Sequence, residues 1–533
     1  MEKLHLPWNS VGNLLEDAAR KHADRPLFIF EDEKLSYREV DTRVSRIANA
    51  LRELDVKKGD AVSVMLHNGF DFPLIWLAIA KAGAVMVPVN INYQAHDLEY
   101  ILNDSSASLM IIHHDFLSRF EAIRGRVPGI RDVLVLGDGN SLYKSFEQQV
   151  DRAADSFTID DVGDEDLLNI QYTSGTTGFP KGCMLTHRYW MVTAYHIRDM
   201  VQLDHTDVDL TAQSFYYLDG QWNVLMCMIA GAAIVIMPKF SVSKFWPTVI
   251  KNNVTFFYVL STMPNYLLSR EPDALERNHK VKRVLCSAIV PALHETFEQR
   301  FSCPWREVFG MTETGTDIFV PFDDRDCVGS GAIGTPVSTK EARIVDSTDN
   351  QLPDGEAGEL IIRGEPMMSG YWQKPEATEE VFRGGWLHTG DLAFRDEKGY
   401  FHLVGRVKDM VRRNAENISS AEVEGVLVQH PKIKVAAIVP VPDLIHGEEV
   451  KAYVILNDNE DKDSLPPQEI IAFAQSRLAR FKVPRYIEYV TDLPRTPSER
   501  VEKHKLIKAK DDLRLDSYDA EREIWITGDN LEG

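Results

Sequence analysis

Residues 172–182, Y-T-S-G-T-T-G-F-P-K-G, restrict what this chain can fold into more than any other stretch. The run holds four serine or threonine hydroxyls, three glycines and one lysine in eleven positions. Glycine lets backbone N–H groups approach an oxyanion closely, while the hydroxyls and Lys181 add donors and a positive charge. An apolar segment, 167–172, precedes the run, and a helical pattern begins near His187. The sequence therefore predicts a strand–loop–helix unit whose loop binds a polyphosphate.

Two other interpretations of this loop have to be weighed. Gly175, Gly178 and Lys181 do not fit the Walker A spacing G-x-x-x-x-G-K-[ST]. Serine, threonine and glycine are also common in polar surface loops, so composition alone does not distinguish a phosphate site from an ordinary loop. Whether this loop binds phosphate or is an ordinary surface loop therefore depends on the other motifs of the chain.

Helical and strand patterns alternate on both sides of this loop. Ser36 and Glu39 form a capping box that begins a helix with apolar residues on one face through Leu51. Strands are predicted at 61–66, 85–89, 108–112, 133–136, 167–172, 232–237 and 256–259, and helices at 72–82 and 242–252. This alternation indicates a large layered α/β domain.

The pattern changes after Arg406. Ser419 and Glu422 form a second capping box, which begins a helix that continues through Leu427. Further strands are predicted at 435–441, 450–456 and 486–489, and a helix at 468–478. These elements suffice for a compact α+β domain of about 110 residues. We therefore expect an α/β protein with a large N-terminal domain, 1–407, and a small α+β C-terminal domain, 408–533.

The composition excludes some partners. Lysine and arginine number 59 and aspartate and glutamate 81, which gives a formal charge of −22 over 533 residues. Such an acidic chain is a poor binder of nucleic acid. The five cysteines have no metal-ligand spacing, which favours reduced thiols in the cytoplasm. We find no signal-peptide core in the first residues, and the longest apolar run, 224–237, is too short for a transmembrane segment.

A second motif, F-G-M-T-E-T at 309–314, contains groups suited to a nucleotide and its metal. Phe309 beside a glycine offers a flat surface on which a base can stack. Glu313 between two threonines is a hard oxygen ligand of the kind that Mg²⁺ prefers. The motif thus predicts a base-stacking and magnesium-binding segment.

Two glycine-bounded motifs near the end of the large domain contain an acid and a base. G-W-L-H-T-G-D at 385–391 ends in Asp391, whose carboxylate has enough lone pairs to hold a cis-diol. L-V-G-R-V-K-D-M at 403–410 contains Arg406, whose guanidinium fork suits phosphate. Without the other motifs, Asp391 and Arg406 would be interpreted as a surface salt bridge.

In this order, the motifs resemble those of the adenylate-forming superfamily, which comprises acyl-CoA synthetases, peptide-synthetase adenylation domains and beetle luciferases. The resemblance includes the loop T-S-G-T-T-G-x-P-K-G, the motif Y-G-x-T-E with Phe309 in place of tyrosine, and both glycine-bounded motifs, and it covers nearly the whole chain. The segments K-D-M-V-R-R and E-N-I-S-S-A-E-V-E are most similar to the crotonobetaine/carnitine-CoA ligase-like branch. The chain is thus identified as an acyl-CoA synthetase of this superfamily.

The resemblance implies an AMP-forming acid–thiol ligase that uses ATP, Mg²⁺ and coenzyme A. A small-molecule carboxylate reacts with ATP to give an acyl-adenylate and pyrophosphate, and the CoA thiol then displaces AMP. The resemblance also implies that the C-terminal domain rotates about a hinge at Lys408 between the two steps. It leaves a homodimer open as the oligomeric state.

The resemblance assigns roles to individual positions. The implied nucleotide-binding residues are Thr173, Ser174, Gly175, Thr176, Thr177, Gly178, Lys181, Ser287, Ala288, Phe309, Gly310, Met311, Thr312, Asp391 and Arg406. The implied metal ligands are Glu313 and Thr173, the CoA contacts are Arg412 and Ala415, and the catalytic residues are Lys181, Arg500 and the hinge residue Lys408. The implied acyl pocket contains Tyr217, Asp219, Gln221, Gly310 and Thr314. Tyr217 is also typical of a packed core aromatic, and Asp219 of a turn residue rather than a ligand for a cationic substrate.

The sequence departs from the family at three working positions. Residues 494–501, P-R-T-P-S-E-R-V, have Glu499 and Arg500 where the family has a glycine and the lysine used in adenylation. Arginine keeps the charge of lysine but is planar and wider, so the two are not equivalent at a tight site. Ala415 replaces a glycine that lines the approach of the pantetheine arm, and Ser287-Ala288-Ile289 replaces G-A-P.

These departures leave several functions open. The leading expectation is a ligase that performs both steps, in which Lys503 or Lys505 is near enough in sequence to substitute for the missing lysine. A second is an adenylation-impaired enzyme that transfers preformed acyl-AMP to CoA. A third is a non-catalytic nucleotide-binding regulator, and a fourth is an enzyme that loads a carrier protein.

Overall fold

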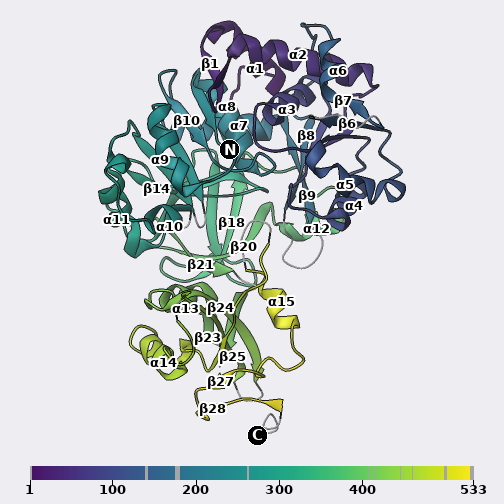
Figure 1. Ribbon diagram of the computed structural model, residues 1–533. Coiled ribbons are helices and arrows are strands. Elements are labelled where there is room, and N and C mark those ends of the chain that lie inside the picture. Colours follow the sequence, from purple (N-terminus) through teal and green to yellow (C-terminus); the bar gives the residue numbers. More distant parts are fainter. Residues whose placement is uncertain are drawn as a thin grey trace. The chain divides into compact units, whose positions relative to one another are not determined.

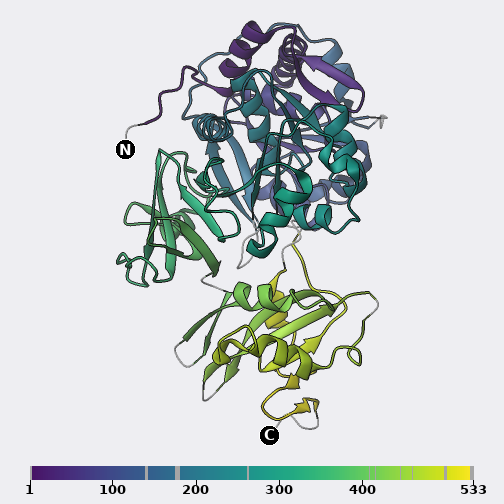
Figure 2. The same cartoon turned by 90° about the vertical axis from the view of Figure 1, so that its left-hand side faces the viewer.

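The computed structural model describes residues 3–137, 142–173, 180–260, 263–287, 289–406, 409–413, 416–443, 446–458, 460–496 and 501–528 (Figure 1 and Figure 2). Packing divides the chain into two compact units. Among the described residues the first unit holds 3–173, 180–342 and 362–387, and the second holds 343–361 and 388–528. The predicted domain boundary between 407 and 408 falls on residues outside this description, so it stays a prediction.

The first unit contains a sheet with the strand order β7-β6-β5-β3-β4-β8-β9. All neighbouring pairs are parallel except β8 and β9, which are antiparallel. The strands are β3 (Ala61–Met65), β4 (Val85–Pro88), β5 (Leu109–His113), β6 (Asp132–Leu136), β7 (Lys144–Ser145), β8 (Leu167–Thr173) and β9 (Lys181–Thr186). The predicted alternation of strands and helices is therefore confirmed in this part of the chain.

A second sheet of the first unit contains strands in the order β16-β15-β14-β13-β12-β10-β11-β1-β2. The strands are β1 (Pro26–Phe30), β2 (Glu33–Ser36), β10 (Val208–Thr211), β11 (Ala233–Ile236), β12 (Phe256–Leu260), β13 (Arg283–Ser287), β14 (Trp305–Met311), β15 (Gly315–Phe319) and β16 (Ala332–Pro336). Six of them, from β14 to β1, are parallel. The apolar run at 224–237 passes from helix α8 (Leu218–Ala230) into β11, as its length suggests.

One apolar core fills the space between these two sheets. It contains buried residues of both sheets and of α1 (Val11–His22), α2 (Tyr37–Glu53), α3 (Asp71–Ala82), α7 (His187–Met200) and α8. Helix α3 is buried on nearly every side, which explains its continuous apolar sequence. Helix α2 begins at the predicted capping box, in which Ser36 and Glu39 exchange backbone and side-chain hydrogen bonds.

Further helices cover the outer faces of the two sheets. Helices α4 (Ala95–Asp104) and α5 (Leu117–Glu121) pack on the first sheet, and α9 (Val242–Lys251) and α11 (Pro291–Phe301) pack on the second. The shorter elements of the unit are η1 (His114–Phe116), η2 (Arg124–Arg126), α6 (Phe146–Asp151), α10 (Met263–Leu268), η3 (Ala274–Arg277), α12 (Pro375–Val381) and β19 (Phe382–Arg383). The result is the layered α/β arrangement that the sequence predicts.

The second unit begins with a group of neighbouring strands and continues as an α+β domain. Strands β17 (Lys340–Val345), β18 (Gly358–Gly364), β20 (Trp386–Arg395) and β21 (Phe401–Arg406) are neighbours in this order, and the first three belong partly to each unit in sequence. The α+β part comprises β22 (Met410–Arg413), β23 (Glu416–Ser419), α13 (Ser420–Leu427), β24 (Ile433–Asp443), β25 (Gly447–Leu456), α14 (Pro467–Gln475), η5 (Arg480–Lys482), β26 (Tyr486–Tyr489), α15 (Lys503–Lys508), β27 (Tyr518–Asp519) and β28 (Ile524–Trp525). Its core is formed mainly by α13, α14 and β24–β26, which confirms the predicted elements.

All five cysteines are free and buried, as expected of structural thiols. Within the described residues, no helix combines the length and the apolar character needed to cross a membrane.

Candidate active site

The predicted phosphate loop joins two antiparallel strands rather than a strand and a helix. Thr173 ends β8 and pairs in register with Lys181, which begins β9, and helix α7 starts only at His187. Strand β9 is not predicted from the sequence, because its segment K-G-C-M-L-T is short and neither alternating nor continuously apolar. Ser174, Gly175, Thr176, Thr177 and Gly178 lie outside the described residues, so their phosphate contacts stay predictions.

Glu313 lies in the turn between β14 and β15 of the first unit. Its side chain is only 9% exposed, and its Oε1 accepts a hydrogen bond from the Tyr371 hydroxyl at 2.8 Å. Its backbone carbonyl accepts a hydrogen bond from the Met368 N–H at 2.8 Å. Among the described residues, no lysine or arginine forms an ion pair with this carboxylate. A buried carboxylate without a cation is costly, so the site fits a divalent metal such as Mg²⁺.

Tyr371 links Glu313 to the strand that follows the phosphate loop. The Lys181 ammonium lies 4.9 Å from the centre of the Tyr371 ring, and Tyr371 forms a backbone bridge with Cys183 of β9. Burial raises the pKa of the Tyr371 hydroxyl, and the neighbouring Glu313 charge raises it further, so the hydroxyl remains a donor at neutral pH. Sequence reasoning missed Tyr371, because it stands 58 positions from Glu313 and no local pattern connects them.

A buried ion pair contacts the turn that contains Glu313. Lys340 Nζ lies 3.1 Å from Asp317 Oδ1, and both side chains are fully buried. Lys340 also donates to the Thr314 carbonyl at 2.8 Å, and the Thr314 hydroxyl donates to Asp317. Burial lowers the pKa of Lys340 and raises that of Asp317, while the attraction between them opposes both shifts. Thr314, predicted to line the acyl pocket, therefore has its side chain engaged in this network.

The segment around Phe309 lies at the end of β14, and its role in base stacking stays a prediction. Phe309, Met311 and Thr312 are half-buried and Gly310 is exposed. A Cβ added at Gly310 would overlap the carbonyl oxygen of Gly315, so only glycine fits this close approach of the two strands. Ser287, at the end of β13, donates to the Val308 carbonyl at 2.7 Å and thereby ties β13 to this segment. Ala288 lies outside the described residues.

The predicted acyl-pocket residues lie at the start of helix α8. Tyr217 is the N-cap residue, is half-buried and accepts a hydrogen bond from Asn90 at 3.1 Å. Asp219 is half-buried in the first turn. Gln221 is fully buried: it accepts from Asn169 at 3.1 Å and donates to the Phe215 carbonyl at 3.0 Å. Both polar ends of Gln221 are thus used within the protein, and its substrate role stays a prediction.

In the second unit, Asp391 and Arg406 occupy facing positions on the antiparallel strands β20 and β21. Arg406 Nε lies 2.6 Å from Asp391 Oδ1, and the Arg406 side chain also donates to the Thr389 carbonyl at 3.2 Å. Asp391 is 9% exposed on its side chain, whereas Arg406 is 34% exposed. The two residues therefore form a salt bridge between neighbouring strands, as their residue types allow.

The remaining predicted residues belong to the C-terminal part of the chain. Arg412 lies in β22, opposite Asn417. Lys408, Ala415, Glu499 and Arg500 lie outside the described residues. Lys503 pairs with Glu424 at 2.7 Å and Lys505 pairs with Glu502, so both lysines considered as substitutes for the missing adenylation lysine are engaged elsewhere.

Comparison with known proteins identifies the family from which these features come. Residues 15–372 match the AMP-binding enzyme family, and residues 422–500 match the AMP-binding enzyme C-terminal domain. The crotonobetaine/carnitine–CoA ligases of Salmonella paratyphi A and Salmonella typhi are each 32% identical over 517 residues, which is 93% of this chain and 98% of theirs.

Solved structures agree with this match. The anthranilate CoA ligase AuaEII in complex with anthranoyl-AMP superposes with a TM-score of 0.87 at 28% identity, covering 95% of this chain and 98% of its own. ATP-bound MatB from Rhodopseudomonas palustris superposes with a TM-score of 0.85 at 27% identity, covering 94% and 99%.

Proposed function

This chain belongs to the AMP-binding enzyme family and acts as a carboxylic acid–CoA ligase, and we propose how its own residues divide that reaction. The enzyme has the adenylate-forming fold and uses ATP, Mg²⁺ and coenzyme A. In the first step, a carboxylate oxygen attacks the α-phosphorus of ATP and pyrophosphate leaves. In the second step, the CoA sulfur attacks the acyl carbonyl and AMP leaves with the electron pair of the broken bond. Catalysis by such an enzyme consists mainly of positioning and of electrostatic stabilisation.

The observation that carries the residue assignment is the buried Glu313 carboxylate. It has one neutral hydrogen-bond donor, Tyr371, and no basic partner among the described residues. We assign Mg²⁺ to Glu313, with the Thr173 hydroxyl as a second ligand. Mg²⁺ held by these residues would supply positive charge to the phosphate oxygens. Lys181 beside Tyr371 supplies the positive charge at the loop exit.

We assign nucleotide contacts within each unit separately. In the first unit, Phe309 stacks on the base, and the backbone of Gly310–Thr312 and the side chain of Ser287 line the same surface. In the second unit, Asp391 accepts hydrogen bonds from the ribose hydroxyls and Arg406 binds phosphate. Arg406 is the more exposed of the two, so it can exchange its contact with Asp391 for a ligand oxygen at little cost.

The acyl group and CoA are assigned to two further sets of residues. Tyr217, Asp219, Gln221, Gly310 and Thr314 form the acyl pocket, and Arg412 and Ala415 contact CoA. Because the curated relatives act on crotonobetaine and carnitine, we propose Asp219 as the partner of a cationic substrate group. The domain of residues 408–533 rotates about Lys408 between the two steps. The five free, buried cysteines support a cytoplasmic enzyme. The resemblance allows a homodimer, and sedimentation would distinguish a homodimer from a monomer.

The function is tested with a panel of carboxylic acids, ATP, Mg²⁺ and CoA. The panel includes betaine-type and aromatic acids, since the similar ligases act on acids of these two kinds. We expect at least one acid to give acyl-CoA, AMP and pyrophosphate in equal amounts. Formation of ADP and phosphate would contradict the AMP-forming mechanism. Nucleotide binding without any product across the panel would favour a non-catalytic regulator, and transfer only to a carrier protein would favour a loading enzyme.

A second candidate function rests on Arg500 and Glu499. Arginine in place of lysine, with an acid beside it, weakens the positive field that adenylation needs, whereas thioester formation does not use this position. Arg500→Lys, with and without Glu499→Gly, is assayed for ATP–pyrophosphate exchange and for CoA transfer from synthetic acyl-AMP. An increase in exchange alone would support adenylation impairment. Brisk exchange by the wild type with no gain from Arg500→Lys would exclude it.

A further inference from the structure

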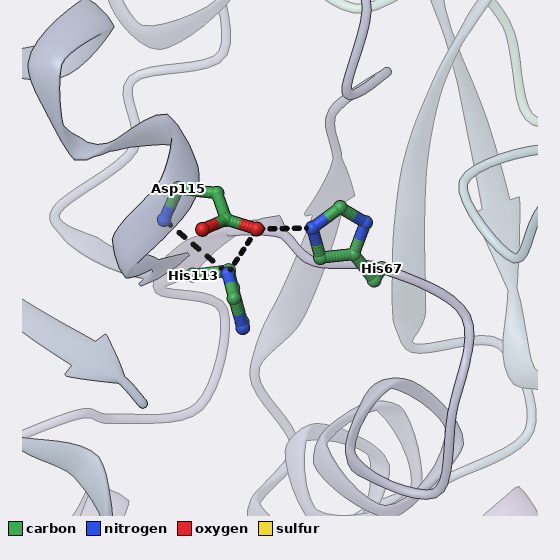
Figure 3. A group of neighbouring side chains, drawn as sticks. All are labelled: His67, His113 and Asp115. Carbon is green, nitrogen blue, oxygen red and sulfur yellow. Dashed lines mark hydrogen bonds and ion pairs between the residues drawn. The ribbon is translucent and has the colours of Figure 1, made fainter. Parts of the chain in front are cut away.

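Two histidines and an aspartate lie close together where strands β3 and β5 of the first sheet end (Figure 3). They are far from the Glu313 turn in sequence. His67 follows β3, His113 is the last residue of β5, and Asp115 lies in the short helix η1. Strands β3 and β5 are parallel neighbours, so both end at the same edge. The carboxyl edge of parallel strands is where α/β folds most often bind ligands.

The ligand atoms of these three side chains are as close as metal coordination requires. His67 Nε2 lies 2.8 Å from Asp115 Oδ2, and His113 Nδ1 lies 3.3 Å from the same oxygen (Figure 3). All three ligand atoms are within 4.8 Å of one another. Tetrahedral Zn²⁺ with bonds of about 2.0–2.1 Å separates its ligand atoms by about 3.4 Å. A cation that binds here replaces the proton between His67 and Asp115 and also the long hydrogen bond, 3.3 Å, that the Asp115 backbone N–H donates to His113 Nδ1.

Neighbouring groups hold the three side chains in place. The second carboxylate oxygen of Asp115 lies 3.0 Å from His114 Nε2, which leaves Oδ2 directed toward His67 and His113. The His67 ring packs 4.7 Å from the ring of Phe116, which is nearly fully buried. Such outer contacts orient metal ligands and strengthen binding.

The cluster opens onto a cavity with an acidic lining. The cavity has a volume of about 610 Å³, and His67 and His113 form part of its wall. Its other charged lining residues are Glu31, Asp32, Glu33, Asp71 and Arg43, an excess of acids that attracts cations. The His67 and Asp115 side chains are 46% and 48% exposed, so an ion in solution can reach them. Three protein ligands leave a coordination position for water or for a small donor molecule from the cavity.

We propose that His67, His113 and Asp115 form a site for a divalent transition metal, with Zn²⁺ as the ion that fits best. Two imidazoles and one carboxylate select Zn²⁺ and its neighbours over Mg²⁺ and Ca²⁺, which prefer oxygen ligands alone. The site therefore differs in metal preference from the Glu313 site, and it does not depend on the ligase activity.

The first test is a Zn²⁺ titration of the full chain, without a histidine tag and after treatment with EDTA, against a chromophoric chelator in millimolar Mg²⁺. His67→Ala and Asp115→Asn should each weaken Zn²⁺ binding by about tenfold or more. His96→Ala, an exposed position in α4 of the same unit, should leave it unchanged. His446→Ala serves as a second control, because Asp443, His446 and Glu449 are the other group of ligand residues found in the described chain. Wild-type affinity in both His67→Ala and Asp115→Asn would overturn the proposal.

The second test needs no variant and so does not depend on how the variants fold. X-ray absorption at the zinc edge of the wild-type protein loaded with one equivalent of Zn²⁺ counts the ligands directly. We expect two imidazoles with oxygen in the remaining positions. Sulfur ligands would instead indicate the cysteines, and a single imidazole would indicate the group around His446. Either result would overturn the assignment.

Discussion

The Tyr371 hydroxyl offers the sharpest test of how Glu313 is positioned. Tyr371→Phe removes one oxygen and keeps the ring, so the cation–π contact with Lys181 and the backbone bridge to Cys183 remain possible. The lost interaction is the 2.8 Å hydrogen bond to Glu313 Oε1, between side chains that are 8% and 9% exposed. The variant thus isolates the support of the carboxylate from the shape of the site.

The structure sets the size of the expected effect. A hydrogen bond to a charged acceptor contributes about 1.5–3 kcal/mol. The lower end applies here, because the Met368 N–H still holds the Glu313 backbone. About 1.5 kcal/mol corresponds to roughly a tenfold change in an equilibrium constant. We expect the Mg²⁺ concentration for half-maximal ATP–pyrophosphate exchange to rise about tenfold, with activity largely restored at high Mg²⁺.

A matched variant separates this effect from a general loss of stability. Tyr37 is fully buried, and its hydroxyl donates to the carbonyls of Cys227 and Ala232 at 2.8 and 2.7 Å, far along the chain from Glu313. Tyr37→Phe should lower the free energy of unfolding by a comparable amount and leave the Mg²⁺ dependence unchanged. If Tyr371→Phe keeps the wild-type Mg²⁺ requirement, or if both variants shift it equally, Tyr371 does not position a metal ligand.

Three further predictions follow from other parts of the chain. Glu313→Gln should lower Mg²⁺-dependent turnover about 10²-fold, the scale of losing one preorganised charge, and an unchanged Mg²⁺ titration would remove Glu313 from the metal site. Lys408→Pro should impair one half-reaction and spare the other, because proline fixes φ at the hinge. The two half-reactions are measured separately, and equal slowing of both would place the hinge elsewhere. Burial lowers the pKa of His187 to about 4, so its unfolded form binds a proton more readily and the free energy of unfolding falls with pH below about 6.5. That contribution is about 2 kcal/mol between pH 7 and pH 5, so the fall in the free energy of unfolding measured with urea between these pH values should be about that much smaller in His187→Asn than in the wild type.

Local patterns were sufficient to predict most of the fold. Both predicted helix starts are found: Ser36 forms a full capping box with Glu39, and the Ser419 side chain accepts a hydrogen bond from the Glu422 N–H. Such caps can be predicted because they are contacts between residues three positions apart. Strand β9 was missed, because its stability comes from pairing with β8 and not from its own sequence. Its presence changes the predicted loop from a strand–helix connection to a connection between two strands.

The residues of the candidate sites likewise fall into those that short motifs predict and those that only tertiary contacts bring together. Glu313, Asp391 and Arg406 stand in short motifs, so sequence alone could propose them. Tyr371 and the Asp317–Lys340 pair support Glu313 through tertiary contacts, which no local spacing records. The His67–His113–Asp115 group was missed for the same reason, since its members meet only because β3 and β5 are adjacent.

A single-turnover experiment tests the central claim, formation of an acyl-CoA through an acyl-adenylate, most directly. The enzyme is mixed with ATP, Mg²⁺ and an accepted acid without CoA, and the products are followed by mass spectrometry before and after CoA is added. The account predicts acyl-adenylate and pyrophosphate in amounts equal to the enzyme, followed on addition of CoA by acyl-CoA and AMP. Acyl-CoA accompanied by ADP and phosphate, with no adenylate at any time, would contradict it.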